Sequence, residues 1–372
     1  MKVLLKSLLA LVGLLAASAP AAAQPLVDCP LRDKPFSSTS PLIDIMLSPA
    51  ASKAVDSIYP GLIEKMPPRF ASKTPPTFAA ILTLREALSM GGRTPPDMAA
   101  FDRALAKVPV TRADRIARCA RYDVDPPRLA IPRQHPRLLL FEKINGFRDG
   151  PSVEGAHKAF VEIAAKKGWG LVTTEKGSAF TSAILRQFDA VIWNNISGDV
   201  LTLSQRRAFQ DYIDNGGGFV GVHGTAGDPV YFWDWYVDSL LGARFAGHPM
   251  NPQFQDARVV VDDPSHPVAR GLPREWVMND EWYSFKNNPR ASGSHVIAHL
   301  DESTYKPEGF GGSLRMGDHP IAWTRCVGRG RVFYSAIGHR PERYSDAVYR
   351  QMLEQATGWA AGLDGKDCKA AK

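Results

Sequence analysis

Residues 217–226 form the stretch GGFVGVHGTA, in which an apolar run lies between glycine-rich turns. Phe219 to Val222 have the length and composition of a buried strand, and the glycines before them end a helical pattern at 204–214 instead of cradling a phosphate. Small residues flank His223 on both sides. A tight strand-to-turn junction of this kind lifts one side chain above the end of a sheet. We therefore expect a buried strand that ends in a raised imidazole.

Strand and helix patterns alternate on both sides of this stretch. Before it, strand patterns occur at 138–141, 170–174 and 189–193, and helical patterns at 153–167 and 182–187. After it, strand patterns occur at 257–261, 295–300, 321–326 and 331–336, and a helical pattern at 346–361 closes the series. The alternation predicts a parallel sheet covered by helices on both faces, and the short connections between the last strands predict an antiparallel part. The predicted fold class is α/β, a flavodoxin-like three-layer sandwich that spans residues 135–362.

The first 24 residues have the composition of a secretory signal peptide. Lys2 and Lys6 give a basic start, an apolar run follows at 8–16, and Ala21 to Ala23 supply the small residues of a cleavage site. The apolar run is too short to span a bilayer, which disfavours the alternative of an uncleaved anchor helix. We expect a mature protein without a membrane span, located in the periplasm or secreted.

Residues 25–134 differ from the rest of the chain because they are rich in proline and alanine. Short helical patterns at 48–59, 78–90 and 97–106 are separated by pairs of prolines, which end helices. This segment contains no chemistry-bearing motif, and we expect a helical cap or lid before the α/β domain. Residues 363–372 form a short tail.

Four cysteines in an exported chain suggest disulfides, and three pairings are available. Cys29 and Cys119 bracket the N-terminal segment, whereas Cys326 and Cys368 lie near the other end of the chain. We favour Cys29–Cys119 and Cys326–Cys368. The alternative is that some of them remain free thiols.

Charge and motif content disfavour several classes of function. The formal net charge of +7 falls to +5 when Lys2 and Lys6 leave with the signal peptide, and the basic residues are interspersed with acids. We therefore expect no nucleic-acid partner. The first strand lacks a Gly-x-Gly-x-x-Gly turn, which disfavours a nicotinamide enzyme. A histidine at the strand-to-turn junction disfavours a serine or cysteine acyl enzyme.

Polar loops follow four strands of the predicted sheet, at 145–149, 194–199, 221–228 and 337–340. Ligands of open α/β sheets bind outside the carboxyl ends of the strands, so these loops predict one shared site. His223 is a candidate general acid or base, or a metal ligand, and the alternative is a structural histidine satisfied by hydrogen bonds. His248 and His339 also lie in glycine-flanked turns near the predicted crevice.

A second candidate segment is NDEWYSF at 279–285. A carboxylate pair beside aromatic rings suits a sugar, because hydroxyls need acceptors and C–H faces pack on rings. Glu281 is a candidate catalytic acid or base, and Trp282 and Tyr283 are candidate stacking residues. The alternative is that the rings belong to the core and the acids cap a strand. Three further aromatic residues, Trp233, Trp235 and Tyr236, are expected to serve packing.

Nitrogen and oxygen ligands from the candidate residues suggest a metal site. A cluster of His223, His248, Glu281 and His339 would suit zinc or a similar divalent ion. No local ligand spacing supports this cluster, so the metal is a hypothesis that depends on the tertiary fold.

Nine short blocks of the chain share one family pattern. They are GGFVGVH (217–223), GARF (242–245), GHP (247–249), DPSHP (263–267), DEWY (280–283), LDESTY (300–305), MGDHPI (316–321), GRVFY (330–334) and GH (338–339). In this order they resemble the ThuA-like (trehalose-utilisation) family. The resemblance implies a fold like that of class I glutamine amidotransferases, without the catalytic cysteine and with histidine in its place. It also implies a sugar or keto-sugar ligand.

The chain departs from the family at one position. Many members have Gly-Phe-Arg-His after the first strand, whereas this chain has Gly146-Phe147-Arg148-Asp149. If the family histidine is a ligand or base, Asp149 must substitute for it.

The sequence therefore predicts an exported enzyme that acts on a sugar or keto-sugar by acid–base chemistry. The predicted catalytic residues are His223, Glu281, His339 and Asp149. The predicted substrate-binding residues are Arg148, Asn195, His248, Trp282 and Tyr283. One alternative is a carbohydrate-binding protein without turnover in the same crevice. A second is a structural or partner-binding module, in which the polar residues of the four loops would be dispersed.

Overall fold

The structure is a computed structural model that describes residues 26–89, 97–365 and 368. The predicted signal peptide and most of the predicted tail lie outside the described residues. Among the residues that are described, no helix has both the length and the apolar character needed to cross a membrane.

A nine-stranded sheet forms the centre of the α/β domain, in the order β2-β1-β3-β4-β13-β12-β9-β6-β7. Its strands are β1 (Arg137–Phe141), β2 (Gly170–Thr174), β3 (Ala190–Asn194), β4 (Gly218–Val222), β6 (Phe254–Val261), β7 (Glu275–Glu281), β9 (His295–Asp301), β12 (Pro320–Val327) and β13 (Gly330–Ser335). The first five strands in this order pair in parallel, and the rest pair antiparallel. The parallel part and the antiparallel part are both as the sequence predicts.

Strand direction determines which side chains can meet. Each antiparallel step reverses direction, so β9 and β7 run the same way as β4 and β13. The carboxyl ends of β1, β3, β4, β7 and β13 therefore lie along one edge of the sheet. No strand was predicted at β7, and the candidate segment at 279–285 begins inside this strand.

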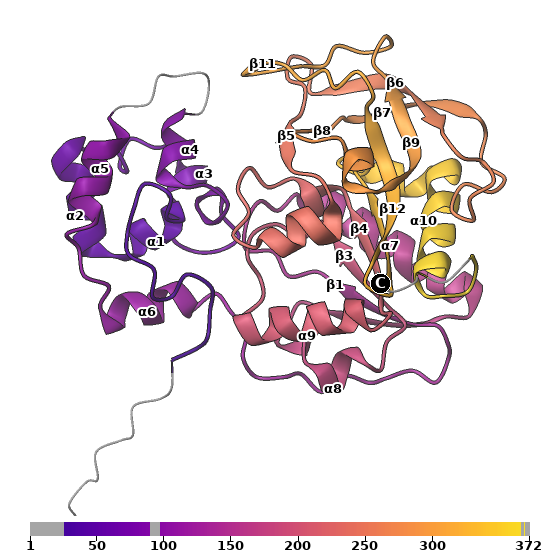
Figure 1. Cartoon of the computed structure of the whole chain (residues 1–372), viewed down its shortest axis with the longest axis horizontal. Helices are drawn as coiled ribbons and strands as arrows, with labels where there is room; N and C mark the ends of the chain where they lie inside the picture. Colours follow the sequence, from indigo (N-terminus) through magenta and orange to yellow (C-terminus); the bar gives the residue numbers. More distant parts are fainter. Residues whose placement is uncertain (1–25, 90–96, 366–367, 369–372) are drawn as a thin grey trace, which may run out of the picture.

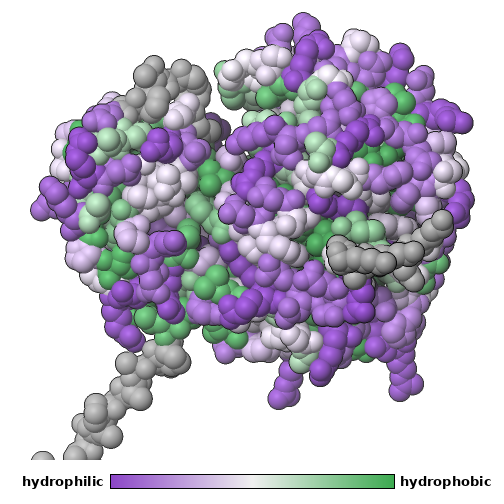
Figure 2. Space-filling model, viewed as in Figure 1, coloured by the Kyte–Doolittle hydropathy of each residue, from purple (hydrophilic) through white to green (hydrophobic). Residues whose placement is uncertain are grey.

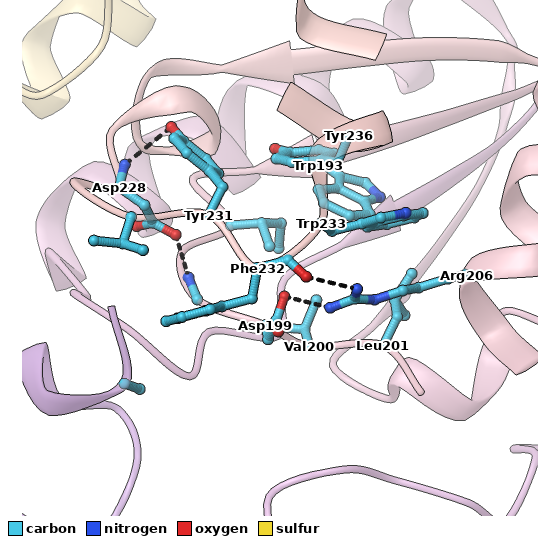
Figure 3. A pocket seen from close by; sticks show the side chains of 14 residues that line it. Trp193, Asp199, Val200, Leu201, Arg206, Asp228, Tyr231, Phe232, Trp233 and Tyr236 are labelled. Carbon is cyan, nitrogen blue, oxygen red and sulfur yellow. Dashed lines mark hydrogen bonds and ion pairs between the residues drawn. The ribbon is translucent and has the colours of Figure 1, made fainter. Parts of the chain in front are cut away.

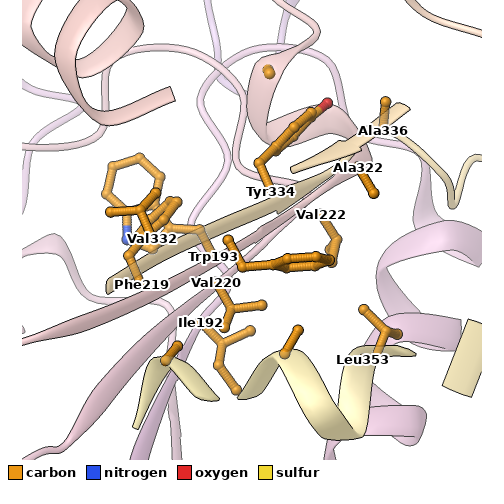
Figure 4. Packing of buried hydrophobic residues seen from close by; sticks show 14 of the residues in the cluster. Ile192, Trp193, Phe219, Val220, Val222, Ala322, Val332, Tyr334, Ala336 and Leu353 are labelled. Atoms are coloured by element: carbon orange, nitrogen blue, oxygen red, sulfur yellow. The ribbon is translucent and has the colours of Figure 1, made fainter. Parts of the chain in front are cut away.

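Helices cover both faces of the sheet (Figure 1). On one face are α7 (Gly150–Lys167) and α10 (Ala347–Ala360), and on the other are α8 (Ser182–Leu185) and α9 (Leu203–Asp214). The strands β3, β4 and β13 are buried at every position, as continuous apolar patterns predict. Figure 4 shows Ile192 and Val220 on the side that faces Leu353 of α10, with Phe219 on the opposite side. The fold is thus the predicted three-layer sandwich.

Short elements complete the domain. They are η2 (Gly177–Ala179), η3 (His223–Ala226), the π-helical turn η4 (Trp235–Leu241), η5 (Pro289–Ser292), η6 (Pro341–Ser345), and the strand pairs β5 (Phe245–Gly247) with β8 (Ser284–Phe285) and β10 (Glu308–Gly309) with β11 (Gly312–Ser313). The rings of Trp233 and Tyr236 stack with centroids 5.8 Å apart, and that of Tyr236 also stacks on Trp193. These aromatic residues serve packing, as expected.

The N-terminal segment folds into short helices at the left of Figure 1. They are α1 (Leu42–Leu47), α2 (Pro49–Ile58), α3 (Pro68–Ala71), η1 (Phe78–Ala80), α4 (Leu84–Ser89), α5 (Met98–Leu105) and α6 (Arg112–Cys119). They enclose a separate core that includes Phe36, Leu42 and Phe101. In the space-filling view, apolar residues gather where these helices meet the α/β domain (Figure 2).

The helix expected at 78–90 is divided into η1 and α4. Leu82 and Thr83 between them leave the helical pattern, because Leu82 accepts a backbone hydrogen bond from Leu42 and Thr83 forms a β-bridge with Pro41. These are tertiary contacts, and the local helical pattern gave no sign of them.

Two disulfides are present, and both confirm the favoured pairing. Cys29–Cys119 joins the start of the described chain to the last helix of the N-terminal segment. Cys326–Cys368 joins β12 to the tail. No cysteine of the described residues remains free.

Candidate functional site

His223 stands at the junction predicted from the sequence. It follows β4 directly and begins η3, with a φ of 36° that non-glycine residues rarely adopt. The Tyr334 hydroxyl donates to the carbonyl oxygen of His223 at 2.8 Å, and this bond helps to hold the strained turn. Strained backbone of this kind clusters at functional sites.

Three side chains meet at the carboxyl edge of the sheet. His223 Nε2 lies 3.2 Å from Nδ1 of His339, which follows β13, and 3.5 Å from Oε2 of Glu281, the last residue of β7. His339 Nδ1 lies 3.0 Å from the same oxygen of Glu281. Three predicted residues, each 58 positions from the next in the sequence, are therefore brought together, as shown by these distances. We call His223, Glu281 and His339 the edge cluster.

The hydrogen-bond partners define which nitrogen of each imidazole is free. His223 Nδ1 lies 2.7 Å from the carbonyl oxygen of Ala336. A carbonyl only accepts, so Nδ1 carries the proton and Nε2 presents its lone pair to the cluster. His339 Nδ1 faces the cluster, so its Nε2 is left for a ligand.

Burial and charge act in opposite directions on the edge cluster. Burial raises the pKa of Glu281, but the neighbouring imidazoles of His223, His339 and His248 outweigh it and hold the pKa well below its usual range. Burial lowers the pKa of His339, but the hydrogen bond and charge of Glu281 outweigh it and raise the pKa overall. The cluster thus combines an ionised carboxylate with an imidazole that retains its proton to higher pH than usual.

Asp280 positions the loop that carries His339. Its carboxylate accepts hydrogen bonds from the backbone N–H of Gly338 at 2.6 Å and of Arg340 at 3.1 Å. Burial raises the pKa of this fully enclosed carboxyl. In the sequence, Asp280 is one of the carboxylate pair expected to accept from sugar hydroxyls or to cap a strand. Its role in holding the His339 loop could not be predicted, because its partners lie far along the chain.

Further polar groups surround the cluster. His248 Nδ1 lies 3.2 Å from Oε1 of Glu281, the oxygen that faces away from the other two members, and Gln253 donates to that same oxygen. Asp149 Oδ2 lies 4.0 Å from His339 Nε2, and this carboxylate also caps α7 by accepting from the Ser152 N–H. Two predicted residues, His248 and Asp149, are therefore placed next to the cluster, and Gln253 was missed.

The edge cluster is also the set of residues that could hold a metal ion. One atom of each, His223 Nε2, His339 Nδ1 and a Glu281 oxygen, lies within 4.8 Å of the others. Ligands about 2.0–2.2 Å from a tetrahedral zinc ion are roughly 3.3–3.5 Å apart, close to the separations seen here. The Ala336 carbonyl behind His223 is the kind of outer partner that fixes a ligating imidazole. The donor set therefore fits a divalent ion.

Two of the predicted substrate-binding residues, Arg148 and Asn195, differ in their surroundings. Arg148 is exposed and forms no hydrogen bond or ion pair with the described residues. Asn195 is buried, where its carbonyl accepts from Gly224 N at 3.0 Å and its amide donates to Asn194 and Tyr344. These internal bonds use both hydrogens of the amide, so it has no N–H left to donate to a ligand.

The two predicted stacking residues are enclosed by protein. The Trp282 side chain is 0% exposed and its indole N–H donates to the Gln255 carbonyl, so it belongs to the core. Tyr283 is 5% exposed, and its ring packs on the His223 imidazole with centroids 4.3 Å apart. The expectation of a stacking surface at these two rings is corrected: Tyr283 packs against the cluster, and Trp282 belongs to the core.

A separate small cavity is lined by residues outside the edge cluster (Figure 3). Its volume of about 30 Å³ fits one water molecule. The ion pair of Arg206 with Asp199, at 2.6 Å, lies along its wall. Burial raises the pKa of Asp228 to about 7, although hydrogen bonds from Ser197 and Gly198 act the other way. This cavity is too small for a sugar, and none of the edge cluster lines it.

The chain is similar to a family model and to several solved structures. Residues 137–360 match the family model described as ThuA, trehalose utilisation. A ThuA-like protein from Bacteroides uniformis is 28% identical, with a TM-score of 0.53, over 62% of this chain and 93% of that one. A ThuA-like protein from Parabacteroides merdae is 18% identical, with a TM-score of 0.48, over 63% and 91%. The glutaminase domain of Trypanosoma brucei CTPS, solved with bound acivicin, is 13% identical, with a TM-score of 0.40, over 63% and 98%. No curated protein matches the chain.

Proposed function

Because the chain belongs to the ThuA (trehalose utilisation) family, we propose that it is an enzyme that acts on a sugar or keto-sugar at the edge cluster. One observation carries the proposal: two imidazoles and a carboxylate meet within 3.5 Å at the edge of the sheet where ligands of this fold class bind.

His339 is the member of the cluster suited to touch the substrate. Its side chain is 14% exposed, whereas those of His223 and Glu281 are 3% and 2% exposed. Glu281 accepts from Nδ1 and fixes the imidazole, which leaves Nε2 to give a proton to a sugar oxygen or to take one from it. His223 lies behind this pair with a free lone pair and can accept a proton from Nδ1. Such a relay supports hydrolysis, elimination or isomerisation beside a carbonyl.

The same three residues would hold a divalent ion if the protein uses one. A bound ion would polarise a hydroxyl or carbonyl oxygen of the sugar. Asp149 and His248, which flank the cluster, would then be the groups nearest to a bound substrate that can move a proton. Metal analysis of untagged protein tests this part: a stoichiometric divalent ion that is lost in His223→Ala supports it, and protein without such an ion rejects it.

The proposal also covers the location of the protein and the roles of its two segments. Two disulfides are typical of oxidising compartments, which supports the periplasm or the exterior of the cell. We assign the chemistry to residues 135–362 and a capping role to 25–134. Fractionation of cells that express the full chain, followed by N-terminal sequencing of the mature protein, tests the location.

A ligand screen tests the activity. Wild-type protein is mixed with a panel of disaccharides and 3-keto-glycosides that includes trehalose and 3-keto-trehalose, and thermal shift is followed by product analysis. Turnover that is lost by orders of magnitude in His223→Ala supports an enzyme. Binding without any product supports a carbohydrate-binding protein instead, and a panel without a ligand rejects the proposal.

A further inference from the structure

Two half-exposed phenyl rings lie beside the edge cluster. Phe147 is 38% exposed and Phe254 is 37% exposed, in contrast to the enclosed rings of Trp282 and Tyr283. A single exposed apolar side chain is ordinary. These two differ because both pack on one imidazole of the edge cluster. We infer that Phe147 and Phe254 form the two walls of the sugar-binding cleft above His339. This inference rests on the proposed function.

Both rings contact the imidazole that faces the solvent. The Phe147 ring stacks over His339 with centroids 6.4 Å apart and planes inclined by 22°. The Phe254 centroid is 5.2 Å from the same imidazole, with planes inclined by 56°. Phe254 is also the cross-strand partner of Glu281, which ties its position to that of the cluster. A ligand held between the rings therefore meets His339 Nε2.

The loop that carries Phe147 is held from two sides. Phe147 N donates to the Ser197 hydroxyl at 3.0 Å, and Asn145 O accepts from Thr77 N at 3.1 Å. A Cβ at Gly146 would lie 2.4 Å from the Ile81 side chain, so no larger residue fits between the loop and the N-terminal segment. These contacts fix the position of the loop in the absence of a ligand.

The N-terminal segment also supports the ring itself. The centroid of Phe78, in η1, lies 5.0 Å from that of Phe147, and Phe70 packs on Phe78 at 5.3 Å. On the other wall, the Arg340 guanidinium lies 5.7 Å from the Phe254 centroid. Rings that are fixed in advance cost less entropy when a ligand binds. Phe78 is therefore a positioning residue, and the N-terminal segment contributes to the site through it.

The chemistry of the walls defines the ligand. Two apolar rings pack on the C–H faces of a pyranose, while a polar nitrogen between them meets a ring hydroxyl or carbonyl oxygen. The cleft thus fits a pyranoside with one sugar ring against the phenyl walls.

Kinetics with the sugar that the wild type turns over, with 3-keto-trehalose and trehalose tried first, test the cleft. Phe147→Ala and Phe254→Ala should each raise KM about tenfold or more and change kcat less, because each removes a ring that packs on the C–H face of the sugar. Phe254→Tyr should restore KM, and Phe78→Ala should raise KM less than Phe147→Ala does. Tyr59→Ala removes a half-exposed ring of the N-terminal segment and should leave KM unchanged.

Saturation-transfer NMR on the same sugar gives a direct readout of the contact. Saturation of aromatic protons should reach the C–H face of the sugar in wild type and weaken in both alanine variants, whose melting temperatures are measured alongside. Turnover by wild type with an unchanged KM in both variants overturns the cleft and leaves the proposed function standing. A wild type that binds no sugar overturns both.

Discussion

Among the described residues, two glutamates lie beside histidines that are themselves buried, and the difference between these two pairs separates a structural site from a candidate catalytic one. The first is the edge cluster, with Glu281. The second joins Glu302 to His319, whose Nδ1 lies 2.9 Å from the carboxylate and 3.0 Å from the Tyr305 hydroxyl. His319 Nε2 lies 2.9 Å from the Tyr283 carbonyl oxygen, and the side chain is 0% exposed. Every polar atom of that imidazole is satisfied by protein.

The edge cluster has one nitrogen left over. His339 Nε2 has no hydrogen bond to any of the described residues, and Asp149 Oδ2 lies 4.0 Å from it, beyond hydrogen-bond distance. A buried carboxylate beside histidine therefore does not by itself identify a functional site. An imidazole with an unused nitrogen that reaches solvent is the more informative feature.

Removal of the unused nitrogen should have the largest effect. His339→Ala should lower kcat/KM for the accepted sugar about a thousandfold, since a positioned acid or base contributes roughly 10²–10⁴-fold. The melting temperature should change little, because the side chain is partly exposed. Steady-state kinetics and thermal unfolding of the same preparation check both parts. A His339→Ala variant with a much lower melting temperature but an unchanged kcat/KM would reverse the assignment of the two pairs.

The second pair should respond in the opposite way. His319→Ala leaves the Glu302 carboxylate without its imidazole partner and should lower the free energy of unfolding by about 2–3 kcal/mol. Urea titration measures this loss. The folded variant should retain kcat/KM within a few fold, and a selective loss of turnover would show that His319 belongs to the active site.

The pH dependence of stability should also come from the second pair. The hydrogen bond from His319 lowers the pKa of Glu302 to about 2, despite partial burial. The unfolded chain has a glutamate pKa of about 4.3. A lowered pKa in the folded state stabilises the protein above the unfolded value, and this contribution is lost as pH falls from about 4.3 towards 2. The stability gap between wild type and Glu302→Gln should therefore close over that range, and a gap that is independent of pH would contradict the assignment.

The smallest effect is expected at Asp149. Asp149→Asn retains the side-chain cap of α7 but removes the negative charge near His339. A partly exposed charge pair contributes about 1 kcal/mol or less, so kcat/KM should fall about fivefold. Kinetics beside His339→Ala check the ratio. A loss as large as that of His339→Ala would make Asp149 a catalytic group that replaces the family histidine.

The parallel part of the sheet could be predicted because its signals are local. β3 and β4 are continuous apolar runs of strand length, and helix α9 follows its own periodicity. His223 could be found for the same reason, since the small residues around it are adjacent in sequence. The polar loops after four strands then indicated one edge of the sheet.

The rest of the site depends on distant partners. β7 contains Asn279, Asp280 and Glu281, whose burial is compensated by groups near residue 338, so no local pattern marks it as a strand. Phe254 begins β6 in a polar stretch, and the sequence analysis started that strand three residues too late. Trp282 and Tyr283 look like ligand platforms in sequence, because composition does not tell an exposed ring from an enclosed one.

The pairing of β6 with β7 restricts where residues can be inserted or deleted without loss of the site. Asp280 anchors the His339 loop, and its neighbour Glu281 completes the edge cluster. A deletion of one residue within β7 would turn both carboxylates to the opposite faces of the sheet. Libraries that insert or delete residues should therefore spare 254–281 and use the β10–β11 hairpin, where Gly311 has open space around it.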